Sequence, residues 1–299
     1  MKTELETLQD KPTDALGELL FKLAKAQLDK NRTEEQKVLK ELDHVLKTNQ
    51  GIADLLGRKK TLEDVLKPKK ETFSEEVTVE NYNVEDLFNV PFEEAANSIL
   101  DNQLFKRFGG RFYNGILKET ASLFGKDAKP KRAFGVLNAR EELQNKVNSI
   151  VKESIETGKS TDQAVAELKK FTGSYAETVY RTQSAKAYNA GRMRQLEDPH
   201  VRTLVGAVQY NSLKDVDTRP DHAALDGFMF SPHDPIAKVL TPPLYYNCRC
   251  YLTMITKDEL NSRGLLDARG KLKPQGRRNI PKENFGTRKD AKLFDVYKD

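Results

Sequence analysis

The sequence predicts an α+β protein in which mostly α-helical N-terminal and middle regions precede a small mixed α+β C-terminal domain and a basic tail. Three observations predict this class. Apolar residues recur at helical spacing through much of the first 198 residues. Near residue 200 the pattern changes to short, alternating, Val-rich stretches that are typical of strands. Residues 261–299 hold eleven Lys and Arg against five Asp and Glu, a net +6 in a chain whose total is +5.

The composition favours long solvated helices over one thick core. Charged residues make up 32% of the chain, tryptophan is absent, and the mean hydropathy is -0.68. No apolar run approaches the roughly 18 residues needed to cross a bilayer, and the start, MKTELETLQDK, lacks an apolar signal region. The sequence therefore predicts a soluble, intracellular protein without a membrane partner.

Residues 1–70 form the predicted N-terminal helical region. Two apolar stripes at helical spacing predict two helices, and TEEQ at residues 33–36 is a capping box that opens the second. KTNQG at residues 47–51 is expected to end that helix, and Pro68 to close a short third one. The stripes consist of Leu16, Leu19, Leu20 and Leu23, then Val38, Leu39, Leu42, Val45 and Leu46.

Residues 71–135 are predicted to combine an extended linker with helices. Residues 70–90 lack a helical period, whereas Pro91 occupies the favoured first position of a helix that runs through FEEAANSILDNQLF. A second joint is predicted at residues 126–135, which are rich in Lys, Gly and Pro.

Residues 136–198 predict three helices packed as neighbours in a bundle. The first carries the stripe Leu143, Val147, Ile150, Val151 and Ile155 and ends at Gly158. The second opens with the capping box STDQ at residues 160–163 and ends at Gly173. The third opens at SYAE and is expected to reach about residue 196.

Residues 199–264 predict the small α+β domain. Its candidate strands are VRTLVGAVQYNSL, GFMFS and CRCYLTMI, and TKDE at residues 256–259 caps a short helix that ends at Gly264. Residues 265–299 follow as a basic extended tail.

The two cysteines of the chain, Cys248 and Cys250, are separated by one residue. On a strand they would share one face, where a disulfide between them is strained but joint coordination of a soft metal is favourable. We expect His222 to be the third ligand of a structural zinc ion, with His233 or an aspartate as the fourth. The alternative is a pair of buried, reduced cysteines that act as small apolar side chains.

An acidic loop, DVDTRPDHAALDG, surrounds His222. Such a cluster can hold a catalytic base, and a metal-dependent, perhaps hydrolytic, enzyme centred on His222, Asp226, Cys248 and Cys250 is one alternative function. It can equally form a turn and a helix start in which Arg219 pairs with a carboxylate. The structural interpretation is favoured, because no nucleophile lies at a recognisable spacing, and no residue is assigned as catalytic.

The basic tail is predicted to contact a phosphate backbone or an acidic protein surface. A plain solvated terminus is the alternative. A free-standing nucleic-acid-binding module is a further alternative function, although the tail offers few aromatic side chains for base stacking. The candidate contact residues are Arg269, Lys271, Lys273, Arg277, Arg278, Arg288 and Lys289.

An ordered set of motifs spans about 80 residues, from YRTQSAKAYNAGR through DTRPDHAALDG to PPLYYNCRC. In combination this set resembles the C-terminal domain of the phage head-morphogenesis family, the minor head proteins similar to the F protein of phage Mu. NVPFEEAANSIL also resembles the helix that often opens the family's middle region. One departure is that Tyr245 and Tyr246 precede NCRC, where the family often has Gly and an aromatic residue. The matching positions are Arg181, Thr182, Asn189, Gly191, Asp217, Thr218, Arg219, Pro220, His222, Leu225, Gly227, Pro232, Pro242, Pro243, Asn247, Cys248, Arg249 and Cys250.

The resemblance implies a virion protein of a tailed bacteriophage. It implies a minor head (capsid) protein, associated with the portal vertex, that takes part in head morphogenesis and genome delivery. The implied partners are the portal protein, a capsid or scaffolding protein, and packaged DNA. The implied locations are the capsid interior or portal vertex, and the host cytoplasm during assembly. We expect the helical body to dock on the portal and the basic C-terminus to contact DNA or the capsid interior.

Overall fold

The computed structural model describes residues 14–66, 92–100, 110–124 and 136–276, together with the isolated positions Leu5, Leu8, Leu87, Val90, Ile280 and Pro281. The predicted joint at 126–135 and the tail beyond residue 281 lie outside these residues, as does most of the linker at 70–90.

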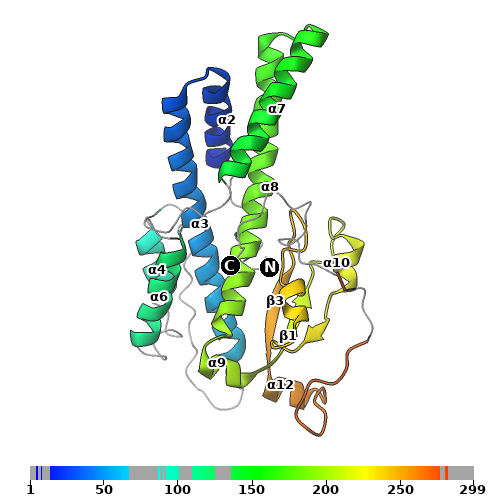
Figure 1. Cartoon of the computed structure of the whole chain (residues 1–299). Helices are drawn as coiled ribbons and strands as arrows, with labels where there is room; N and C mark the ends of the chain where they lie inside the picture. Colours follow the sequence, from blue (N-terminus) through cyan, green and yellow to red (C-terminus); the bar gives the residue numbers. More distant parts are fainter. Residues whose placement is uncertain are drawn as a thin grey trace.

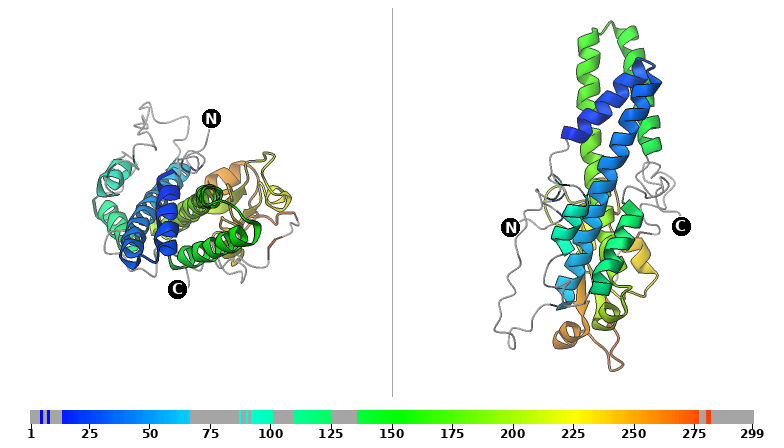
Figure 2. Two further views of the ribbon diagram at one scale, coloured as in Figure 1. Left: turned by 90° about the horizontal axis from the view of Figure 1, so that it is seen from above. Right: turned by 90° about the vertical axis from the view of Figure 1, so that its left-hand side faces the viewer.

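Two helices of 35 residues each, α3 (Arg32–Leu66) and α8 (Thr161–Gln195), form the long axis of the molecule. Helices α2 (Asp14–Leu28) and α7 (Val136–Thr157) pack against one half of this pair. Against the other half lie α4 (Phe92–Leu100), α6 (Gly110–Phe124) and a small sheet, with the sheet on the side away from α4 and α6 (Figure 1). The hairpin of α7 and α8 extends well past the sheet at one end of the molecule (Figure 2).

The predicted apolar stripes build the core of the elongated half. The α7 stripe is only partly buried, since Val151 and Ile155 remain exposed while its other members are covered. The capping box at Ser160 forms as expected: its side chain accepts from Gln163 N at 3.2 Å, and Gln163 Oε1 accepts from Ser160 N at 2.9 Å. The buried members of this core include Leu16, Leu20, Leu23, Val38, Leu42, Leu46, Leu143, Val147, Ile150 and Leu168.

Two predicted helix ends are wrong, because α3 runs through Gly51 and α8 runs through Gly173. At Gly51 a Cβ atom would lie 2.6 Å from the Phe92 ring, so glycine makes room for α4 without ending the helix. The three-helix prediction for residues 136–198 is therefore replaced by a two-helix hairpin. The predicted capping box at residues 33–36 is also wrong: α3 starts at Arg32, and the Asn31 side chain accepts from Glu34 N at 3.1 Å.

Helices α3 and α8 approach each other closely at two glycines. A Cβ atom on Gly57 would lie 1.9 Å from the Tyr188 carbonyl oxygen, and one on Gly191 would lie 2.1 Å from the Asp54 carbonyl oxygen. Real Cβ atoms do not reach such distances, so the observed helix separation requires glycine at both positions.

Buried ion pairs join the same two helices. Arg192 and Arg194 of α8 pair with Asp64 and Asp54 of α3, and both carboxylates are almost completely buried. Asp64 also accepts a hydrogen bond from Met254 N at 3.1 Å, and so reaches the sheet. Breaking a buried pair by removing one partner typically costs about 3–5 kcal/mol, so these charges fix the register of α3 against α8.

The sheet contains β1 (Val205–Asn211), β2 (Met229–Phe230) and β3 (Tyr251–Thr256) in the order β2-β1-β3, with both pairings antiparallel. Val208 in the central strand pairs with Phe230 and Met254. The first strand begins later than predicted because Asp198 caps a helix, accepting from His200 N at 2.9 Å. Four short helices accompany the sheet: α9 (Pro199–Leu204), α10 (Pro220–Ala224), α11 (Ile236–Leu240) and α12 (Lys257–Ser262).

The α+β class predicted from the sequence is confirmed. The sheet shares one core with α3 and α8, in which Val208 and Met254 lie among residues such as Ile52 and Leu56. The predicted cap of α12 also forms, with Thr256 Oγ1 accepting from Glu259 N at 3.2 Å. The domain boundaries at residues 70, 135, 198 and 264 remain predictions. Within the described ranges, no helix is both long and apolar enough to span a membrane.

Replacing Gly191 with alanine tests the close approach of α3 and α8. We expect Gly191→Ala to destabilise the protein by about 1–3 kcal/mol or more, since the new methyl group overlaps the α3 backbone. Gly173→Ala is the matched control on the same helix, where a Cβ atom would meet nothing within 4 Å. It should stabilise the protein by about 0.5–1 kcal/mol. Urea unfolding measures both changes, and equal midpoints for the two variants would contradict the assignment.

Candidate functional site: a buried cysteine and histidine cluster

The structure brings His222, Cys248 and Cys250 together in the interior. His222 Nδ1 lies 3.6 Å from Cys248 Sγ and 3.5 Å from Cys250 Sγ. One candidate ligand atom from each residue lies within 4.8 Å of the others, and the three residues are only 3%, 1% and 3% exposed. Both cysteines are free thiols, as expected from their spacing.

His222 reaches the cluster from α10, a helix of one and a half turns that Pro220 begins. The cysteines do not belong to a strand as predicted, because β1 ends at Asn211, opposite Tyr251, and the ladder ends there. Their side chains nevertheless point the same way, since both sulfur atoms lie within 3.6 Å of His222 Nδ1.

Helix α8 holds this segment in place through residues that the family resemblance had singled out. Asn189 Nδ2 donates to the Cys250 carbonyl oxygen at 3.3 Å, and Asn189 Oδ1 accepts from Leu252 N at 3.0 Å. Thr182 Oγ1 accepts from Asn247 N at 3.0 Å, where the chain turns through a positive φ of 55°. The backbone that presents the two thiols is therefore fixed from outside the sheet.

The surroundings of the two thiols shift their pKa values in opposite directions. Burial opposes ionisation of Cys248, but hydrogen bonds from Cys250 and His222 hold the pKa of its thiol well below the ordinary value. The hydrogen bond to Cys248, together with burial, raises the pKa of the Cys250 thiol. Two cysteine sulfur atoms beside an imidazole form a donor set suited to a soft or borderline metal ion.

The acidic loop forms a structural turn. Asp215 Oδ1 accepts from Asp217 N at 3.2 Å and from Thr218 Oγ1 at 2.9 Å. Arg249, not Arg219 as predicted, pairs with Asp215 at 2.6 Å, and this hydrogen bond lowers the pKa of the Asp215 carboxyl. Arg219 lies over the Tyr245 ring instead, 4.7 Å from its centroid.

The enzymatic alternative requires Asp226 to lie beside the cluster, but its carboxylate is engaged elsewhere. Its carboxylate accepts from Ser212 N at 2.8 Å and pairs with Lys214 at 2.7 Å. Asp226 therefore closes the loop between β1 and β2.

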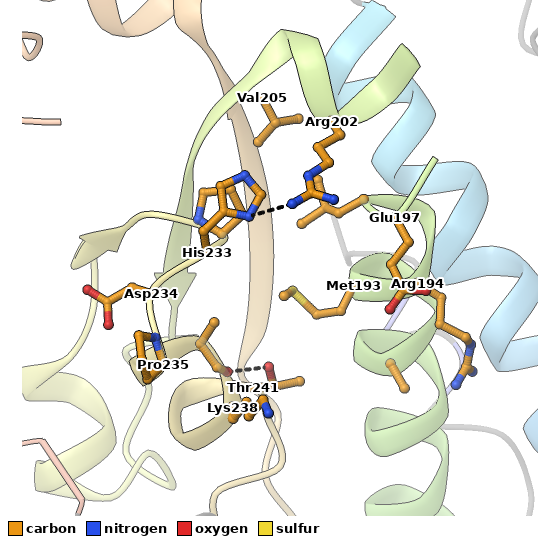
Figure 3. Close-up of a pocket in the computed structure, with 14 residues that line it drawn as sticks. Met193, Arg194, Glu197, Arg202, Val205, His233, Asp234, Pro235, Lys238 and Thr241 are labelled. Atoms are coloured by element: carbon orange, nitrogen blue, oxygen red, sulfur yellow. Dashed lines mark hydrogen bonds between the residues drawn. The ribbon is translucent and has the colours of Figure 1, made fainter. Parts of the chain in front are cut away.

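His233 lies elsewhere, so its expected role as a fourth ligand is wrong. Its ring Nδ1 is 3.4 Å from Arg202 Nη2, in a cleft of about 840 Å³ between α8 and α11. Figure 3 shows this cleft, with His233 and Arg202 facing each other and Met193 lining the side formed by α8.

The start of the basic tail is folded, which corrects its description as extended from residue 265 onward. Leu266 and Leu272 form a β-bridge around a turn in which Asp267 accepts from the backbone N–H groups of Arg269 and Lys271 at 2.8 and 2.9 Å. Lys273 Nζ donates to the Gly264 carbonyl oxygen at 2.7 Å. The remaining candidate contacts, Arg277, Arg278, Arg288 and Lys289, lie outside the described residues.

Sequence reasoning missed the buried charges of α3. Asp54, Arg58 and Asp64 occupy a stretch that otherwise contributes apolar side chains to the core, and Arg58 Nε donates to Asp54 Oδ2 at 2.9 Å. For Asp54 and Arg58, the signal that could have found them is the spacing of four residues between opposite charges within an otherwise apolar stretch.

Comparisons with known proteins show which part of the chain is similar to a known family. Residues 145–253 match the family described as Phage Mu protein F like protein. This range contains α8, β1, β2, the first half of β3 and all three residues of the cluster. Residues 145–253 are therefore similar to the phage Mu F-like family, as the motifs in this part of the chain had indicated.

Three relatives overlap parts of the chain. The "Mu-like prophage FluMu F protein" of Haemophilus influenzae is 30% identical over 129 residues, which cover 42% of this chain and 30% of that protein. The "Putative capsid assembly protein F" of Escherichia phage Mu is 32% identical over 88 residues, 29% of this chain and 20% of that protein. An uncharacterized protein of Methanocaldococcus jannaschii is 31% identical over 110 residues, 36% of this chain and 16% of that protein. The chain thus matches less than a third of the length of each relative, and no solved structure matches it.

Substitution of Asn189 tests its role in holding the thiol-bearing segment. Asn189→Leu should leave the Cys250 carbonyl and the Leu252 N–H without their partner, at about 1–3 kcal/mol for each buried group. Asn148→Leu on the exposed face of α7 is the control and should change the free energy of unfolding by less than about 0.5 kcal/mol. Chemical denaturation compares the two, and an unchanged stability in Asn189→Leu would refute the assignment.

Proposed function

We propose that this protein is a minor head protein of a tailed bacteriophage that acts in capsid assembly, associates with the portal vertex and takes part in genome delivery. The observation that carries the proposal is the family match over residues 145–253, together with the similarity to a relative named as a putative capsid assembly protein. The buried cluster and the hydrogen bonds from α8 supply this domain with a rigid frame, which suits a protein that acts by binding partners.

The elongated helical half is the proposed docking surface for the portal protein. Four apolar side chains remain exposed near the free end of the α7–α8 hairpin, and Ile155 is the most exposed of them at 78%. Exposed apolar side chains of this kind contribute binding free energy when a partner covers them. They are Leu28, Val151, Ile155 and Val165, which line a groove of about 410 Å³ between α2, α7 and α8.

The basic C-terminal segment is the proposed contact for packaged DNA. Its excess of positive charge suits a phosphate backbone, and the capsid interior is where such a partner is available during assembly. Capsid or scaffolding protein is a further proposed partner during head morphogenesis.

Charge placed on the α7 surface tests portal docking. We expect the double variant Val151→Glu and Ile155→Glu to weaken co-purification with the portal ring by more than roughly tenfold, because two apolar contacts are lost and two carboxylates lose water. The control, Asn145→Glu with Ser149→Glu, adds the same charge to exposed positions on a different face of α7 from Val151 and Ile155. Equal loss in both variants, or none in either, would argue against this surface.

Neutralising the distal tail tests DNA contact. We expect glutamine at Arg277, Arg278, Arg288 and Lys289 to reduce DNA affinity and to flatten its salt dependence, by about 0.9 in slope for each lost phosphate contact. The control replaces Lys37, Lys40, Lys169 and Lys170, which are exposed on α3 and α8, and so removes the same charge. Binding of duplex DNA over a salt series gives both slopes. Portal binding should persist in the tail variant, and its loss there would contradict the proposed division of roles.

A further inference from the structure

We propose that His222, Cys248 and Cys250 hold a structural Zn²⁺ ion that joins the acidic loop to the segment before β3. This site is independent of the proposed head-assembly function, because it rests on the geometry of the three side chains alone.

The two nitrogen–sulfur distances fit a tetrahedral zinc site. Zinc lies about 2.3 Å from a cysteine sulfur and about 2.0–2.1 Å from a histidine nitrogen. At tetrahedral angles, these lengths separate the nitrogen from each sulfur by about 3.5–3.6 Å. The observed separations of His222 Nδ1 from Cys248 Sγ and Cys250 Sγ are 3.6 and 3.5 Å. An ion can therefore be accommodated with little movement of these side chains.

The burial of the site favours a structural role for the metal. All three ligands are almost completely covered, whereas a catalytic zinc keeps a position open to substrate. His222 lies 26 residues before Cys248 and 28 before Cys250 in sequence. It is carried by α10, which lies outside the sheet. The ion would therefore link two segments that the β-ladder does not join, and its binding would contribute to the folding of this unit.

Metal analysis of the full-length chain, purified without chelator, is the direct test. We expect one equivalent of zinc per chain, and X-ray absorption at the zinc edge should give two sulfur ligands for each ion. Cobalt exchanged into the site should produce a thiolate charge-transfer band. A chain with reduced thiols that holds no stoichiometric metal and gives no cobalt band would overturn the proposal, as would zinc without sulfur ligands.

Variants assign the ligands and separate metal loss from misfolding. His222→Ala should lose the zinc, whereas His222→Cys should retain it with three sulfur ligands, because Cys₃ sets also bind this ion. His233→Ala is the control and should keep zinc at the wild-type level. Removal of the metal by a chelator should lower the Tm of the wild-type chain but not that of a folded His222→Ala variant. Retention of zinc after substitution of both Cys248 and Cys250 with serine would place the metal elsewhere and refute the assignment.

Discussion

The close crossing of α3 and α8 is the constraint on which the rest of the structure depends. Gly57 and Gly191 allow the two backbones to approach to distances that any side chain would prevent. At the same crossing, Asp54 and Asp64 pair with Arg194 and Arg192 away from water. Backbone contact without side chains contributes little binding free energy of its own, so the buried charges supply the specificity that fixes where along each helix the contact forms. Because α2, α4, α6, α7, α9 and β3 all pack against α3 or α8, an error in this register would displace most of the structure that is built on these two helices.

The candidate site inherits its geometry from this crossing. Asp64 lies at the crossing and accepts from the backbone of β3, so the position of the sheet is tied to that of α3. On α8, Asn189 lies two residues before Gly191 and Thr182 lies two to three turns before it, and both hold the segment that carries Cys248 and Cys250. The same helix thus contacts α3 on one face and orients the thiols on another. The motif residues on α8 and those around the two cysteines are far apart in sequence but in contact in the structure. This contact is a physical reason for them to be found in the same sequence.

The elongated half of the molecule has a different character. Its core is built almost entirely from apolar side chains, and its free end leaves apolar surface uncovered, with Ile155 as the clearest case. The opposite half is closed by the cluster and by ion pairs such as Arg249 with Asp215. This division suits a protein in which one end is a rigid frame and the other is available to a partner.

The sequence by itself determined the fold class, the existence of most helices, the capping box at Ser160 and the grouping of His222 with the two cysteines. These features depend on local spacing and on a motif whose residues are read directly. Only the tertiary structure decided that α3 and α8 continue through Gly51 and Gly173, because a glycine ends a helix or admits a neighbour according to what packs against it. It also decided that Arg249 rather than Arg219 pairs with Asp215, and that His233 lies with Arg202 and not with the cysteines. Those outcomes depend on which segments, distant in sequence, come into contact. The crossing of α3 and α8 determines these contacts, and it is set by two glycines and by buried charges about 130 residues apart.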